Sequence, residues 1–247
     1  MRTLFRVSLY VAMLLLAACA AEEGHLKASA ETSNINVQLG MTYMQQGNNK
    51  TAMKRLQKSI RQNPDNALAY STLGLLNARL GETEEAESNF KKAVKLDPDN
   101  SAIRNNFGAF LCKQKRYKES QVQFLQAIKN PLYGTPEHAY LNAGSCTDNK
   151  AEAEKYFRAS LRRNPRFPAG LLKMASLSLE LKRYLSARGY IQRFHAVHKP
   201  VAASLWVSIQ VEKVLGDTNL LASQVMLLKE KFPDSEETRL YLQSKEK

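Results

Sequence analysis

Residues 67–100 read ALAYSTLGLLNARLGETEEAESNFKKAVKLDPDN, and this stretch decides the fold because its key positions recur 34 residues away along the chain. Gly40, Gly74 and Gly108 keep that spacing. The other pairs with the same spacing are Ala52 and Ala86, Leu56 and Phe90, Phe90 and Phe124, and Pro64 and Pro98. A fixed period of this length indicates a repeat architecture.

The stretch resembles the tetratricopeptide repeat, a unit of two antiparallel helices. The resemblance rests on Tyr70, Leu73, Gly74, Gly81, Ala86, Phe90, Ala93 and Pro98. It implies close packing in which a glycine of the first helix (helix A) faces a large apolar residue of the second (helix B). Asn63-Pro64-Asp65-Asn66 is expected to end one helix and cap the next. We therefore predict an all-α tetratricopeptide-repeat superhelix of about six repeats.

The repeat pattern weakens after residue 130. Gly144 and Ala153 are nine positions apart where the pattern has twelve, which suggests a shortened turn between the two helices of repeat four. Repeats five and six match less well again, as terminal repeats often do.

The N-terminus has the layout of an export signal, with Arg2 and Arg6 before an apolar run at 7–16. Leu16-Ala17-Ala18-Cys19 resembles a bacterial lipobox, which implies lipidation of Cys19; the alternative is an ordinary cleaved signal with a chance cysteine. Since Ala20, and not Asp, follows Cys19, the resemblance implies the periplasmic face of the outer membrane. We predict a signal peptide at 1–18, a lipidated tether at 19–32 and the repeat domain at 33–247.

Composition favours a binding protein over an enzyme. The net charge of +13 favours acidic partners, and export makes nucleic acid an unsuitable one. The sequence contains no phosphate loop, nucleophile elbow or HExxH motif, so we expect no catalytic residues and no cofactor. The histidines 25, 138, 195 and 198 lack further ligands nearby in sequence, so no metal site is expected.

Cys112 and Cys146 are the two cysteines that remain after Cys19 is assigned to the anchor. They occupy nearly equivalent positions late in helix A of neighbouring repeats, and the periplasm is oxidising. We favour a disulfide between them, while two buried free thiols remain the alternative.

A partner-binding groove is implied by the resemblance, because helix A positions 2, 5, 9, 12 and 13 line the concave surface of tetratricopeptide repeats. In the first three repeats these positions carry Asn34, Val37, Met41, Met44, Leu68, Ser71, Leu75, Ala78, Arg79, Ala102, Asn105, Ala109 and Lys113. The mixed apolar and amide lining suits an extended peptide or an amphipathic helix, although Leu68 and Leu75 could instead belong to the core.

The lipobox, the six repeats and the two cysteines together resemble the type IV pilus biogenesis and stability lipoprotein family (PilF/PilW). This resemblance implies a pilotin, a lipoprotein that binds the type IV pilus secretin subunit and promotes its outer-membrane localisation and multimerisation. Two other adaptor roles stay open: a lipoprotein of the outer-membrane β-barrel assembly machinery, and an adaptor for peptidoglycan enzymes. Tetratricopeptide motifs report architecture and specify no ligand.

Overall fold

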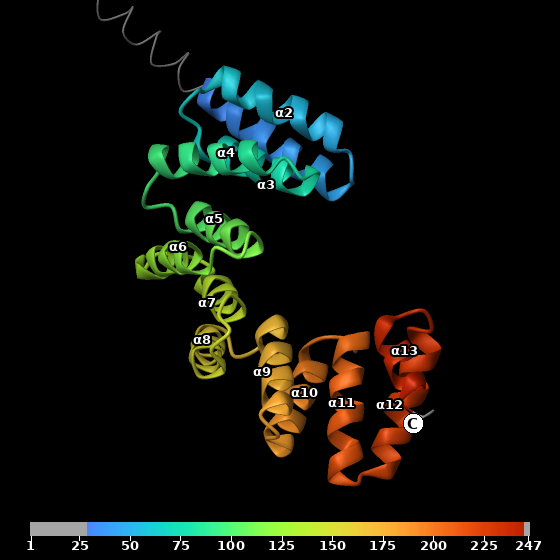
Figure 1. Cartoon of the computed structure of the whole chain (residues 1–247). Coiled ribbons are helices and arrows are strands. Elements are labelled where there is room, and N and C mark those ends of the chain that lie inside the picture. The colour runs from blue at the N-terminus through green and yellow to red at the C-terminus, as the bar shows by residue number, and fades with distance from the viewer. Residues whose placement is uncertain (1–28, 245–247) are drawn as a thin grey trace, which may run out of the picture. The chain divides into compact units, whose positions relative to one another are not determined.

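The computed structural model describes residues 29–244, and over that range the chain is all-α (Figure 1). A first helix covers 29–45. The helices that follow are α2 (Asn49–Gln62), α3 (Ala67–Leu80), α4 (Thr83–Leu96), α5 (Ser101–Lys113), α6 (Tyr117–Lys129), α7 (Pro136–Ser145), α8 (Lys150–Arg163), α9 (Pro168–Glu180), α10 (Tyr184–Val197), α11 (Ala202–Leu215), α12 (Thr218–Lys231) and α13 (Glu236–Gln243). None of the helices within 29–244 combines the length and the apolar character that crossing a membrane requires.

In chain order these helices form six A and B pairs, with the helix at 29–45, α3, α5, α7, α9 and α11 in the A positions. The short helix α13 follows the sixth pair and packs against α11 and α12. The predicted all-α class and the six-repeat organisation are therefore confirmed for the described residues.

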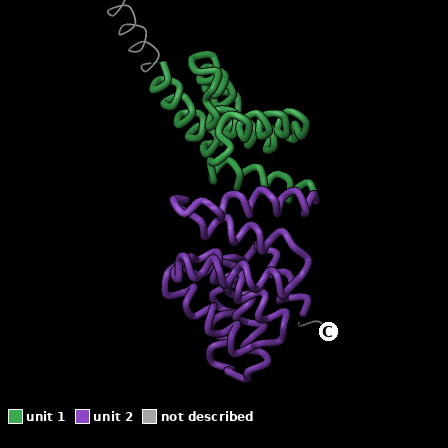
Figure 2. Tube along the Cα trace, turned by 90° about the vertical axis from the view of Figure 1, so that its left-hand side faces the viewer, with its two compact units in different colours: residues 1–114 green, residues 115–247 purple. Residues whose placement is uncertain are grey.

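The chain divides into two compact units, which Figure 2 colours separately. The first ends at Gln114 and the second begins at Lys115. In the first unit, Phe90 stacks on Phe107 with ring centroids 5.6 Å apart, at the centre of an apolar cluster. In the second unit, Phe157, Leu171 and neighbouring apolar residues form the core between α7, α8 and α9.

The predicted packing of glycine against a large side chain holds in three repeats. A Cβ added at Gly40 would lie 2.8 Å from Leu56, and one at Gly74 would lie 3.1 Å from the Phe90 ring. In repeat four the same contact joins Gly144 and Phe157, at 2.7 Å. A methyl group at Gly40 or Gly144 would force neighbouring atoms to shift, and one at Gly74 would push the Phe90 ring by a few tenths of an ångström, so glycine allows the helices of each pair to approach closely.

Asparagine side chains cap the helices where the sequence predicts. Asn66 Oδ1 accepts a hydrogen bond from Ala69 N at 3.1 Å, and Asn100 Oδ1 accepts one from Ile103 N at 3.2 Å. Each bond satisfies one of the amide groups that the first turn of a helix leaves without a backbone partner.

The expectation of a shortened turn in repeat four is wrong. The turn between α7 and α8 contains four residues, 146–149, whereas the turn between α3 and α4 contains two. The missing length is in the helix itself, because α7 has 10 residues and ends one residue after Gly144, while α3 has 14. The spacing in the sequence shows how many residues are missing, but not whether they are missing from the helix or from the turn.

The N-terminal boundary also differs from the prediction. The predicted signal peptide, Cys19 and His25 lie outside the described residues. Residues 29–32, which the prediction assigns to the tether, are already helical. Ser29 Oγ donates a hydrogen bond to Gln62 O at 2.7 Å, which ties residue 29 to the end of α2.

Candidate binding surfaces

The predicted helix A face of the first unit is accessible at most of its positions. We call this set the helix A face: Asn34, Met41, Met44, Leu68, Leu75, Ala78, Arg79, Ala102, Asn105, Ala109 and Lys113. Met41 and Leu68 are each 44% exposed although they are apolar. Asn34, Arg79, Ala102, Ala109 and Lys113 are exposed as well. Exposed apolar side chains among amides and cations are suited to contact with another protein.

Two of the predicted groove residues do not belong to this face. Val37 is only 4% exposed and packs with Leu56, and Ser71 is only 2% exposed. The prediction is wrong for both, because neighbouring helices close over these two positions. Leu75 and Ala78 are half-buried against the Phe90 cluster, and Met44 packs on the Leu56 cluster, so these three support the face from beneath.

Hydrogen bonds fix the first two A helices side by side. Asn66 Nδ2 donates to Ser33 Oγ at 2.8 Å and to Asn34 Oδ1 at 2.9 Å. At the other end of the pair, Arg79 Nη1 donates to Met44 O at 2.5 Å. The helix A face is therefore rigidly held at both ends in this part of the unit, which lowers the entropic cost of binding.

The second unit carries a hollow of about 760 Å³. Its lining residues are Ser176, Leu179, Glu180, Lys182, Tyr184, Trp206, Val207, Gln210, Lys213, Val214 and Ser244. Ser176, Leu179 and Glu180 occupy helix A positions 9, 12 and 13 of repeat five, when Ala175 is aligned with Gly74. Trp206, Gln210, Lys213 and Val214 occupy positions 5, 9, 12 and 13 of repeat six. The position rule, applied to the first three repeats only, did not predict this hollow.

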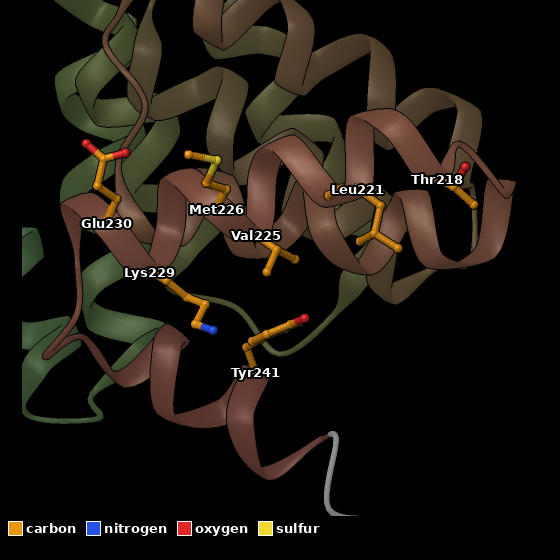
Figure 3. A pocket seen from close by; sticks show the side chains of 8 residues that line it. Thr218, Leu221, Val225, Met226, Lys229, Glu230 and Tyr241 are labelled. Atoms are coloured by element: carbon orange, nitrogen blue, oxygen red, sulfur yellow. The ribbon is translucent and has the colours of Figure 1, made fainter.

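A second hollow in the same unit, of about 690 Å³, lies between α12 and α13 (Figure 3). Val225 and Met226 of α12 and Tyr241 of α13 are among its lining residues. Met226 is 67% exposed, so α12 presents apolar surface beyond the part that α13 covers.

Arginines are concentrated on the B helices of the second unit. Between Lys155 and Val211 the only acidic residue is Glu180. Two arginines bind Glu154 of α8. Arg158 Nη2 lies 2.7 Å from one of its carboxylate oxygens, and Arg183 Nη1 lies 2.8 Å from the other. Hydrogen bonding by Arg158, and then by Arg183, lowers the pKa of the Glu154 carboxyl. The carboxylate stays charged and joins the two B helices across the repeat boundary.

A buried ion pair joins repeats five and six. Glu212 of α11 is 1% exposed, and its Oε1 accepts a hydrogen bond from Arg188 Nε at 2.9 Å. The second carboxylate oxygen bonds to Arg188 Nη2. The bidentate pair fixes α10 against α11.

The cysteines of the predicted disulfide are in different units: Cys112 lies in α5, and Cys146 is the C-cap of α7. Their pairing stays a prediction.

Comparison with known proteins agrees with this architecture. Residues 40–81 match the family profile described as TPR repeat, and residues 67–100 and 89–122 match profiles described as tetratricopeptide repeat. The type IV pilus assembly protein PilF of Pseudomonas aeruginosa is 32% identical over 212 residues, which are 85% of this chain and 84% of that protein. The chain belongs to the PilF/PilW family.

Solved structures of the family share the fold. A structure of Pseudomonas aeruginosa PilF has a TM-score of 0.78 at 31% identity, over 88% of this chain and 99% of that one. A structure of PilW, described as a widely conserved type IV pilus biogenesis factor, has a TM-score of 0.76 at 29% identity, over 85% and 98% of the two chains. The PilF/PilW likeness thus extends over most of the chain.

Proposed function

We propose that this protein is an outer-membrane pilotin that binds the type IV pilus secretin and promotes its localisation and multimerisation. The observation that carries the proposal is the 32% identity to PilF, a type IV pilus assembly protein, over 85% of this chain. The lipobox at Cys19 supports delivery to the outer membrane, because a protein that escorts a subunit needs an anchor at the destination.

The helix A face of the first unit is the proposed secretin-binding surface. It combines exposed apolar side chains, Met41 and Leu68, with the hydrogen-bonding groups of Asn34 and Arg79. Methionine adapts its shape to irregular partners, and the rigid hold of the two A helices keeps the surface ready for binding. An amphipathic helix or an extended segment of the secretin would bury its apolar side against Met41 and Leu68.

Affinity copurification from detergent-solubilised outer membranes tests the partner. The lipidated protein should recover secretin as its main partner, and the Cys19→Ala form should fold but fractionate away from the outer membrane. Recovery of β-barrel assembly components or of peptidoglycan hydrolases in place of secretin would assign the protein to one of the other two assemblies. A deletion strain should lose pili and accumulate secretin monomers, and normal secretin multimers in that strain would refute the pilotin role.

A pair of variants tests the surface. Met41→Asp with Leu68→Asp places two charges on the helix A face, at positions exposed enough to leave the core intact. The matched control is Val122→Asp with Leu185→Asp, which makes the same chemical change at exposed positions of the B helices α6 and α10. Secretin recovery should fall at least about tenfold for the first pair and stay near wild type for the control; equal loss in both pairs would argue against this surface.

A further inference from the structure

We propose that the hollow on repeats five and six is a second docking site, which takes an acidic peptide segment through an apolar anchor side chain. This site is separate from the proposed secretin-binding face, because all of its lining residues lie in the second unit.

The size and lining of the hollow suit a short peptide segment with one apolar anchor side chain. Its volume of about 760 Å³ lies within the range of about 300–1,000 Å³ that is usual for ligand sites. Leu179, Val207 and Val214 supply apolar surface, and Trp206, the only tryptophan of the chain, lines the same hollow. Trp206 is half-buried, and tryptophan is among the residue types enriched at the energetic centre of protein interfaces.

The charge of the hollow selects an acidic occupant. Glu180, the only carboxylate in the lining, is already paired with Lys150, whose Nζ lies 3.2 Å from it. Lys213 Nζ donates to Ser244 Oγ at 3.1 Å and lies 5.4 Å from the centre of the Tyr241 ring. Within 29–244 neither Lys213 nor Lys182 forms a salt bridge. Two unmatched ammonium groups beside an apolar floor attract a carboxylate and repel a basic segment.

The backbone at Lys182 allows the ammonium group to be removed without strain. The same turn position carries Gly47, Gly81 and Gly216 in repeats one, two and six, all with positive φ. Lys182 has a φ of 56° there, a conformation that costs a non-glycine residue free energy. Glycine fits this backbone conformation, so Lys182→Gly removes the charge at the edge of the hollow without adding strain.

The equivalent turn of repeat three offers a matched control, because Lys115 has a φ of 60° and does not line the hollow. Lys182→Gly and Lys115→Gly are the same chemical change in the same backbone conformation. Both should leave the melting temperature at or above that of the wild type, since glycine relieves the strain. Only Lys182→Gly should weaken binding, so a loss of affinity cannot be attributed to unfolding.

The experiment is selection of a displayed library of random ten-residue peptides on the full chain carrying Cys19→Ala, with depletion on the Trp206→Ala form. Selected peptides that lack tryptophan are then titrated while the emission of Trp206 is followed. We expect enrichment of sequences that combine Asp or Glu with an aromatic or aliphatic residue, and a change in Trp206 emission on binding. Trp206→Ala, measured by calorimetry, should weaken binding by about 30-fold, which corresponds to about 2 kcal/mol.

Three results would overturn the proposal: no enrichment over an unrelated carrier, selected peptides that bind Lys182→Gly as well as Lys115→Gly, or enrichment of basic in place of acidic sequences. Self-association of the protein through the hollow, seen as concentration-dependent Trp206 emission without peptide, would also overturn it. The Met41→Asp with Leu68→Asp variant should bind the selected peptides normally. This measurement separates failure of the second site from failure of the secretin-binding face.

Discussion

Adding one methyl group at Gly144 should destabilise the fourth repeat, while the same change at Gly189 should stabilise the fifth. A Cβ at residue 144 would lie 2.7 and 2.8 Å from two Phe157 ring carbons and 3.1 Å from Ala153 O. Carbon atoms in contact are normally about 3.5–4.0 Å apart, so the ring would have to move by about 1 Å. Phe157 is buried among Leu161, Leu171 and Phe167, and this cluster leaves the ring little freedom to move.

The magnitude follows from two opposing terms. Forcing extra volume into a packed core costs about 1–3 kcal/mol, whereas replacing glycine by alanine inside a helix gains at most about 1 kcal/mol. Gly144 is the residue before the last one of α7, so its share of that gain is small. Gly144→Ala should therefore lower the free energy of unfolding by about 1–2 kcal/mol. Gly189 lies inside α10 with no neighbouring atom within 4 Å of an added Cβ, so Gly189→Ala should raise it by about 0.5–1 kcal/mol.

Thermal unfolding followed by circular dichroism measures both variants in the same unit of the same chain. Gly144→Ala should lower the melting temperature by roughly 3–8 °C, and Gly189→Ala should raise it by a smaller amount. A Gly144→Ala protein as stable as the wild type would refute the reasoning, because it would show that the helices of repeat four can separate without cost.

Three further predictions concern the linkages between repeats. Peptide mass analysis without reductant should find Cys112 joined to Cys146. Reduction should lower the melting temperature, because closing a loop of about 35 residues is worth up to about 4 kcal/mol. Free thiols on both residues would exclude the bridge. Burial lowers the pKa of the His195 imidazole below its ordinary value of 6.5, so the imidazole binds a proton more readily in the unfolded chain. The free energy of unfolding should therefore decrease as the pH falls through about 6.5. His195→Asn should flatten that part of the curve of stability against pH. Arg188→Met should lower the melting temperature because it leaves Glu212 buried without its partner. Adding Glu212→Leu should restore most of the lost stability. No recovery in the double variant would show that packing of the arginine stem, and not the unpaired carboxylate, causes the effect.

Much of the fold could be predicted from sequence because the tetratricopeptide signal is local. Helix periodicity, asparagine caps and the spacing of glycine from a large apolar residue all lie within one repeat of 34 residues. Gly74 and Phe90 are 16 positions apart in the sequence and in contact in the structure. A small residue facing a large one therefore predicts from the sequence how α3 and α4 pack. The same logic identified the helix A face, and Met41 and Leu68 are exposed as that face requires.

The sequence could not predict features that depend on contacts between neighbouring helices, because these contacts form only when the chain folds. Val37 and Ser71 follow the same position rule as Met41 and Leu68, yet they are buried, since the rule gives a direction from one helix and not the distance to the next one. The shortening of α7 likewise needed the structure, because the spacing of Gly144 and Ala153 does not show whether the helix or the turn is shorter.

The sequence by itself determined the repeat and its period, because both are encoded by residues close together in the chain, while the export signal stays a prediction. Only the tertiary structure decided which helix A positions remain open to a partner, and it brought Trp206, Lys182 and Lys213 to one hollow from two different repeats. The burial of a side chain and the shape of a hollow depend on how repeats stack, because each of these surfaces is built by residues of two neighbouring repeats.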